Sequence, residues 1–422
     1  MDDDFDPDLT DPDLFGDGPP HEIFQRLRDE DPLHGHQPTS NTPDGEPYWS
    51  LTRHEDVAWA ARNADLFSSA GGGDREGGGT LIEDLPAGFA AGVLFNMQDD
   101  PRHHHIRRQL TPALSPRSLR RIRTELAGRC DRLLDAALER GRSDVLVEVA
   151  AELPLQAISS LMGVPQEDRH FLLDWADATL DYDDHNPGET SRRASEAGAA
   201  MATYCTRVLA EKRACPADDI LSTIVHADLP PEAEPGGPLS DLEQEMLFHL
   251  LVAAGSETTR NSIAAGLLAL MERPEDWAAL RADRGLIPDA VEECLRWASS
   301  TIYNRRTATA DVERHGRTIG AGDKVVLWWQ SANFDERVFP DPHRFDIRRR
   351  PNPHLSFGLG SHFCLGANLA RVEIELVLDG LLDRVERLEP AGQVERTRSN
   401  KHAGFRHVPM WLRPPEAGDE DE

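Results

Sequence analysis

The chain has 422 residues, a formal net charge of −30 at pH 7 and a hydrophobic fraction of 39%. This composition is ordinary for a soluble globular protein, and the acidic balance excludes the basic character of many nucleic-acid-binding proteins. No stretch approaches about 18 consecutive apolar residues, so we expect no membrane span. The acidic start, MDDDFD, predicts no signal peptide. The five cysteines form no CxxC pair, which favours a reducing, cytoplasmic location.

The domain organisation follows from the ends of the chain. At about 150 residues per domain the length allows two or three domains, but no linker or internal repeat divides it, so we expect one domain over residues 19–413. Residues 1–18 carry eight acids and residues 416–422 carry five, without Lys or Arg. We therefore expect residues 1–18 and 414–422 to be disordered acidic tails.

Helical periodicity dominates the chain between these tails. Helices are predicted over residues 117–138, 150–162, 192–212 and 240–272, strands over 48–52, 325–329 and 408–412, and long loops over 70–92 and 228–239. The sequence therefore predicts a mainly α protein with a small β region.

Residues 102–132 are basic, with nine arginines against two acids, a local net charge of +7. Such an island on an acidic protein is typical of a docking face for an acidic partner, and a set of solvated helix faces is an equally weighted alternative. The three consecutive histidines at 103–105 could also indicate a transition-metal site. Consecutive helical residues point in different directions, however, which argues against it.

The predicted helix over residues 240–272 begins with a capping box, Ser240 to Glu243, and ends before Pro274. At 1.5 Å per residue it is about 50 Å long. Its middle, residues 253–259 (AAGSETT), contains poor helix formers, so we expect a local kink or bulge. There Glu257 and Thr258 place a carboxylate beside a hydroxyl, which can deliver protons inside an apolar pocket. A polar patch on a helix is the alternative.

Residues 357–366 (FGLGSHFCLG) place Cys364 in a glycine-rich loop directly before a helical run. Glycine opens backbone conformations that other residues avoid, and loop amides at a helix start can bond a thiolate and lower its pKa. This pattern predicts a thiolate presented to a metal. A buried cysteine in an ordinary turn is the alternative.

The pattern Phe-Gly-x-Gly-x-His-x-Cys-x-Gly and the segment Ala-Gly-x-Glu-Thr-Thr resemble two signatures of the cytochrome P450 family. The resemblance implies the P450 fold, with the long helix above a haem and the cysteine loop beneath it. It implies haem b, iron protoporphyrin IX, with Cys364 as the axial thiolate ligand. It also implies that Glu257 and Thr258 relay protons during dioxygen cleavage.

The same resemblance implies partners for the two haem propionates, which need cationic or donor groups. The candidates are His103, Arg107, Arg306 and His362.

It also gives a structural role to Glu293 and Arg296. Three residues apart on a helix, they would otherwise form a weak surface pair. In the family such a pair joins an arginine of a Pro-x-Arg-Phe segment, here Arg344, in a buried network that supports the cysteine loop.

Residues 254–262, 296–299, 331–336 and 351–355 are similar to bacterial steroid and methyl-branched-lipid hydroxylases. This implies a hydrophobic small-molecule substrate: a steroid, terpenoid or branched lipid. Ser300, Thr301 and Asn304 depart from these relatives and predict a more polar pocket that needs substrate oxygen or water as a partner. The resemblance also makes the loop over 70–92 a mobile lid.

The implied activity is insertion of one oxygen atom of dioxygen into a C–H bond, with electrons from a ferredoxin and its reductase. An acidic ferredoxin is expected to dock at Arg117, Arg120, Arg121 and Arg123. A peroxide-using peroxygenase, which needs no Glu257–Thr258 relay, is one alternative. A non-catalytic haem sensor, which needs no electron-donor face, is another.

Overall fold

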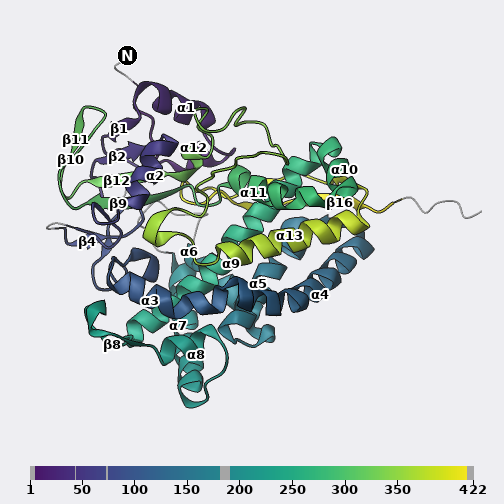
Figure 1. Ribbon diagram of the computed structural model, residues 1–422, viewed down its shortest axis with the longest axis horizontal. Helices are drawn as coiled ribbons and strands as arrows, with labels where there is room; N and C mark the ends of the chain where they lie inside the picture. Colours follow the sequence, from purple (N-terminus) through teal and green to yellow (C-terminus); the bar gives the residue numbers. More distant parts are fainter. Residues whose placement is uncertain (1–4, 43, 73–74, 181–190, 416–422) are drawn as a thin grey trace, which may run out of the picture.

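The computed structural model describes residues 5–42, 44–72, 75–180 and 191–415. A helical body fills one side of the molecule and a smaller sheet region the other, as Figure 1 shows. The helices are α1 His21–Glu30, α2 His54–Arg62, α3 Arg102–Leu110, α4 Pro116–Arg140, α5 Glu152–Met162, α6 Arg169–Leu180, α7 Arg192–Ala214, α8 Ile220–Val225, α9 Asp241–Met271, α10 Pro274–Ala282, α11 Ile287–Ala298, α12 Trp329–Ala332 and α13 Ala367–Arg384. The prediction of a mainly α protein with a small β region is confirmed.

The largest sheet has five strands in the order β1 Leu33–His36, β2 Tyr48–Leu51, β12 Lys324–Trp328, β9 Tyr303–Ala308 and β3 Phe67–Ser68. Its pairs are antiparallel except the parallel pair β2 and β12. A second sheet has the order β13 Arg387–Pro390, β16 Pro409–Arg413 and β6 Arg142–Asp144. The three predicted strands correspond to β2, β12 and β16.

Four two-stranded hairpins complete the described strands: β4 Gly77–Gly78 with β5 Leu85–Pro86, β7 Asp228–Leu229 with β8 Gly237–Pro238, β10 Val312–Arg314 with β11 Arg317–Ile319, and β14 Glu395–Arg396 with β15 Phe405–His407. The first two lie in the predicted loops over 70–92 and 228–239. Arg75 of the first loop forms ion pairs with Glu46, outside the loop, and with Asp84 of the same loop. Its role as a lid stays a prediction.

The central helix α9 forms as its capping box predicts. The Ser240 hydroxyl accepts a hydrogen bond from the Glu243 amide, and the Glu243 carboxylate accepts one from the Ser240 amide. The predicted kink or bulge does not interrupt the helix, since residues 241–271 are α-helical throughout. Instead, the Thr258 hydroxyl donates to the Ala254 carbonyl at 3.2 Å. The hydroxyl thus bonds the helix backbone without interrupting it.

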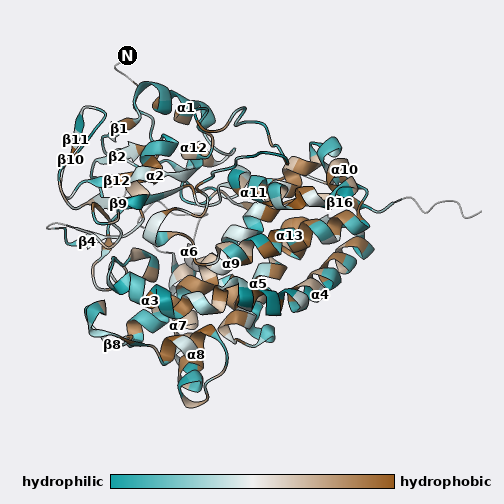
Figure 2. Ribbon diagram, viewed as in Figure 1, coloured by the Kyte–Doolittle hydropathy of each residue, from teal (hydrophilic) through white to brown (hydrophobic). Residues whose placement is uncertain are grey.

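Helix α9 packs against α5, α6, α11 and α13 in the centre of the helical body (Figure 1). Figure 2 shows hydrophobic residues concentrated on inner helices such as α13, whereas α1 and the β10–β11 hairpin are mostly hydrophilic. No helix of the described residues is long and apolar enough to cross a membrane.

The N-terminal segment differs from the prediction of a disordered tail over residues 1–18. Within it, residues 5–18 pack against the sheet region: Leu9 is fully buried, and Phe15 is buried and stacks on Trp328. Apolar side chains stand between the acids of this segment and hold it against the sheet. The free energy gained by burying them exceeds the cost of bringing the acidic side chains close to the protein, which the prediction from composition did not consider. Residues 1–4 and 416–422 lie outside the described residues, so a disordered tail there stays a prediction.

Candidate functional site

The loop that carries Cys364 can form only because glycine occupies its turns. Gly358 and Gly360 adopt φ values of +66° and +76°, a region that other residues rarely enter. A Cβ atom on Gly360 would lie 2.3 Å from the Ala61 carbonyl oxygen. The Cys364 amide donates to the Phe357 carbonyl at 2.8 Å, which closes the loop. Helix α13 begins three residues after the cysteine.

Cys364 faces a cavity of about 240 Å³ between this loop and α9. Burial raises the pKa of the thiol, while the amides of Gly366 and Ala367 and the charge of Arg107 act in the opposite direction. The predicted stabilisation of the thiolate by loop amides is therefore present but only partly offsets burial. A coordinated metal ion deprotonates a thiol outright.

The upper wall of the cavity is built from α9. Ala254, Gly255 and Thr258 line it, and a Cβ atom on Gly255 would lie 2.8 Å from the Ile158 side chain of α5. The two helices therefore depend on glycine to pack this closely. Small residues at this point leave space over the cysteine loop.

The cavity also has the polar groups that the sequence predicted. Ser300, Thr301 and Asn304 all line it. The Ser300 hydroxyl lies 3.1 Å from the Thr258 carbonyl oxygen, and the Asn304 side-chain oxygen accepts a hydrogen bond from the Trp329 indole at 2.8 Å. The Asn304 oxygen is thus engaged, and its amide N–H groups remain as donors.

Two predicted propionate partners stack on each other. The rings of His103 and His362 have centroids 4.1 Å apart. Burial lowers the pKa of both, that of His362 to about 2, and therefore favours the neutral imidazoles. His104 is exposed and His105 only half-buried. The three consecutive histidines therefore point in different directions, as expected, and do not form a joint metal site.

The two predicted arginines supply positive charge beside these rings. Arg306 lines the cavity, and burial lowers its pKa to about 10. Its guanidinium donates to the Arg305 carbonyl at 2.9 Å. Within the described residues, neither Arg306 nor Arg107 forms an ion pair with an acidic side chain. Arg306 and His362 line the cavity, whereas His103 and Arg107 do not: His103 stacks on His362, and the charge of Arg107 acts on Cys364. Two guanidinium groups without an acidic partner and two imidazoles at or near a cavity that contains a cysteine fit a flat prosthetic group with carboxylate substituents.

The acid–alcohol pair has a partner that sequence reasoning missed. Glu257 is 3% exposed, and its carboxylate oxygen lies 3.1 Å from Nδ1 of His402. The His402 side chain is 18% exposed and lines a second cavity of about 10 Å³, the size of one water molecule. His402 lies between β14 and β15, and no local pattern marks its link with α9. The pair of His402 and Glu257 thus connects the partly exposed His402 with α9 at the residue next to Thr258, which lines the cavity.

Glu373 of α13 is a second residue that sequence reasoning missed. It is 1% exposed and lines the cavity. Burial raises the pKa of its carboxyl group well above the usual range, against a hydrogen bond from Thr259 that lowers it, so burial favours the neutral acid. In the sequence Glu373 is one acid on a predicted amphipathic helix, and no pattern marks it as a buried residue of the cavity.

The network of Glu293 and Arg296 is buried as predicted, but its third member is different. Both side chains are 0% exposed and lie 2.7 Å apart. The Arg349 guanidinium, rather than that of Arg344, joins Glu293 at 3.1 Å. Arg344 is exposed and contributes its carbonyl oxygen. Because Phe345 is buried, its neighbour Arg344 faces outward and Arg349 reaches the carboxylate instead.

This network continues to the cysteine loop. The Arg296 guanidinium donates to the Asn333 carbonyl at 3.0 Å, and the Asn333 side-chain amide donates to the Ser356 hydroxyl at 2.9 Å. Ser356 directly precedes the loop and also donates to the Leu295 carbonyl at 2.8 Å. The buried ion pair is therefore connected to the start of the loop by hydrogen bonds.

The basic island lies on α3 and α4, and α4 packs against α13. Of its predicted docking residues, Arg121 pairs with Asp218 and Arg123 with Glu375, both at 2.8 Å. Arg117 and Arg120 are exposed and form no ion pair within the described part of the chain. Of the four predicted docking residues, Arg117 and Arg120 are therefore the two whose charge is not paired with an acid of the described chain.

Comparison with solved structures gives the fold. Mycobacterium marinum cytochrome P450 CYP268A2 in complex with pseudoionone has a TM-score of 0.84 and 34% sequence identity, with 93% of this chain and 94% of that chain covered. At this identity and coverage the similarity extends along nearly the whole chain.

Curated relatives agree with this similarity. Putative cytochrome P450 126 of Mycobacterium tuberculosis is 46% identical over 414 residues, which covers 96% of this chain and 97% of the relative. The steroid C26-monooxygenase of Rhodococcus jostii is 36% identical, with 93% and 82% covered. The methyl-branched lipid omega-hydroxylase of Mycobacterium bovis is 37% identical, with 92% and 90% covered. The family model of cytochrome P450 matches residues 81–410, and the chain therefore belongs to the cytochrome P450 family of monooxygenases.

Proposed function

We propose that the protein uses haem b, held by the Cys364 thiolate, to insert one oxygen atom of dioxygen into a C–H bond of a hydrophobic small molecule. The supporting observation is the cavity in which Cys364 faces α9, with the Arg306 guanidinium in its wall and the charge of Arg107 close to Cys364. A bound haem supplies the dioxygen activation and the oxidation of the C–H bond. The residues of the chain hold the group, exclude water and move protons.

The two haem carboxylates would be held by both arginines and both histidines. Arg107 and Arg306 supply positive charge. His103 and His362 supply N–H donors. Together the four side chains provide both positive charge and hydrogen-bond donors for two carboxylates.

Proton delivery is assigned to three side chains. The Thr258 hydroxyl lines the cavity, and rotation of its side chain turns it from the Ala254 carbonyl toward the cavity. Glu257 is its neighbour on α9 and pairs with the partly exposed His402. His402 takes a proton from the exterior and passes it to Glu257, and Thr258 delivers it at the cavity wall. Protons thus enter one at a time while bulk water stays out.

The substrate class is a steroid, terpenoid or branched lipid that carries an oxygen atom. Its hydrophobic part follows from the relatives named for steroid and branched-lipid oxidation. The oxygen follows from Thr301 and the amide N–H groups of Asn304, because polar groups that line a cavity need partners; the Ser300 hydroxyl already has the Thr258 carbonyl. Asn304→Leu should weaken binding of oxygenated ligands more than that of hydrocarbon analogues, measured by the haem spectral shift on ligand binding.

Electrons are proposed to come from an acidic ferredoxin and its reductase, with Arg117 and Arg120 at the docking face. Product formation should require dioxygen, NADH and the ferredoxin system, with hydrogen peroxide a poor substitute. Equal turnover with peroxide alone would make the protein a peroxygenase. Ligand binding without any turnover would make it a haem sensor. A cytoplasmic location is part of the same proposal.

A further inference from the structure

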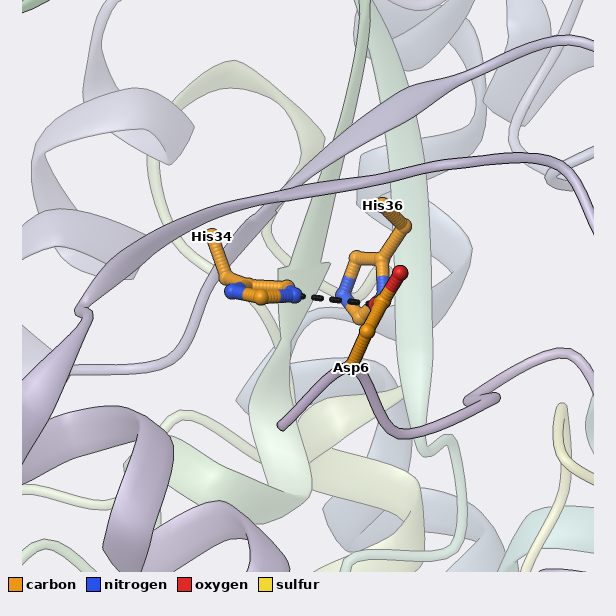
Figure 3. Close-up of side chains that lie close together, drawn as sticks. All are labelled: Asp6, His34 and His36. Carbon is orange, nitrogen blue, oxygen red and sulfur yellow. Dashed lines mark hydrogen bonds and ion pairs between the residues drawn. The ribbon is translucent and has the colours of Figure 1, made fainter. Parts of the chain in front are cut away.

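A cluster of two histidines and one aspartate lies far from the cysteine cavity, at the edge of the five-stranded sheet. His34 and His36 are two residues apart on β1, so both side chains leave the same face of the strand. Asp6 reaches them from the N-terminal segment. Figure 3 shows both rings turned toward its carboxylate.

The spacing of these groups is that of metal ligands. One Asp6 carboxylate oxygen lies 3.1 Å from Nε2 of His34 and 3.4 Å from Nδ1 of His36. One ligand atom from each of the three residues lies within 4.8 Å of the other two. In a tetrahedral zinc site with bonds of about 2.0–2.2 Å, neighbouring ligand atoms are about 3.3–3.6 Å apart. The cluster needs little rearrangement to surround such an ion.

Each histidine also has an acceptor for its other ring nitrogen. Nδ1 of His34 lies 3.0 Å from the Asp31 carboxylate, and Nε2 of His36 lies 2.8 Å from the Ser50 hydroxyl. Metal-bound histidines almost always donate their second N–H to such a group. With those protons on the outer nitrogens, two lone pairs face the Asp6 carboxylate, and a cation between the three groups would satisfy all of them.

From this geometry we propose that His34, His36 and Asp6 bind one Zn²⁺ ion. Two imidazoles and one carboxylate favour zinc over the hard cations calcium and magnesium. Both histidines are nearly inaccessible, whereas the Asp6 side chain is 48% exposed, so a water molecule can complete the coordination from the solvent side. The ion would join the N-terminal segment to the edge strand β1, so its binding should hold this segment against the sheet.

A second cluster, made only of acids, differs from the histidine cluster because protein cations already neutralise it. Asp44, Glu46 and Asp84 also gather within metal-binding distance. Lys324 already pairs with all three carboxylates, and Arg75 pairs with two of them. Their charge is compensated by protein cations, so they do not carry the same proposal.

The test compares zinc binding by the full-length haem-loaded protein with that of two ligand variants, Asp6→Asn and His34→Gln. Each protein is stripped with a chelator and then titrated with Zn²⁺ against a chromogenic competitor, with bound metal measured by elemental analysis. His104→Gln, which removes an exposed histidine from another surface, is the matched control. An unchanged carbon-monoxide spectrum shows that each variant is folded.

The wild-type and His104→Gln proteins should bind one more zinc equivalent than the ligand variants, or bind it with at least about tenfold higher affinity. Zinc should also slow proteolysis of the N-terminal segment in these two proteins alone. Equal zinc binding by all four proteins would overturn the proposal, and the cluster would then be a carboxylate that accepts hydrogen bonds from two histidine N–H groups. Because Asp6 and His34 belong to different segments, failure of one variant to fold leaves the other as the test.

Discussion

Replacement of Arg349 should destabilise the protein far more than replacement of Arg344, although the sequence pattern favours Arg344. The Arg349 guanidinium donates to both Glu293 carboxylate oxygens and to the carbonyls of Pro340, Asp341 and Arg344. Removing one member of a buried ion pair costs about 3–5 kcal/mol. Because Arg296 remains paired with Glu293, we expect the lower end, about 3 kcal/mol, for Arg349→Ala. Loss of the exposed Arg344 side chain should cost no more than about 0.5 kcal/mol.

The assay is urea-induced unfolding of both variants and the wild type, followed by circular dichroism. Haem retention measured in parallel reports on the cysteine loop, since the network reaches Ser356 through Asn333. Arg349→Ala should lose haem at lower urea concentration than the wild type, and Arg344→Ala should not. A loss of stability in Arg344→Ala equal to that in Arg349→Ala would refute the assignment of the third member.

Three further predictions concern proton and electron delivery. Thr258→Ala should lower the product formed per NADH by roughly tenfold or more, with peroxide rising in its place; unchanged coupling would remove Thr258 from the relay. His402→Gln should slow turnover and increase the solvent isotope effect while substrate affinity stays constant, and a normal isotope effect would contradict its role. The double variant Arg117→Glu, Arg120→Glu should slow first-electron transfer roughly tenfold at low ionic strength, with the difference disappearing in high salt. An unaltered rate at low salt would show that the two arginines are only a solvated face.

The features that sequence analysis predicted well are those encoded locally. The capping box at Ser240 and the glycines around Cys364 specify their own backbone geometry, because each depends on residues within a few positions. The polar pocket residues Ser300, Thr301 and Asn304 were also predicted, since they stand out against the pattern of the relatives. Features of this kind can be predicted from the sequence because their geometry depends on neighbouring residues and little on tertiary packing.

The features that it missed depend on contacts between distant segments. Arg349 replaces Arg344 because the turn after Pro342 buries Phe345 and exposes its neighbour. His402 reaches Glu257 across 145 positions of the chain. Residues 5–18 are ordered because they pack against strands that come later in the chain. The composition of the segment could not predict this contact.

The central claim is that the Cys364 thiolate holds the haem iron, and the carbon-monoxide spectrum of the reduced protein tests it most directly. The wild type should show the red-shifted band of thiolate-ligated haem. Cys215→Ala, which removes an exposed cysteine, should show the same band and serves as the control. Cys364→Ala should lack it even when haem is present. Persistence of the red-shifted band in Cys364→Ala would contradict the assignment.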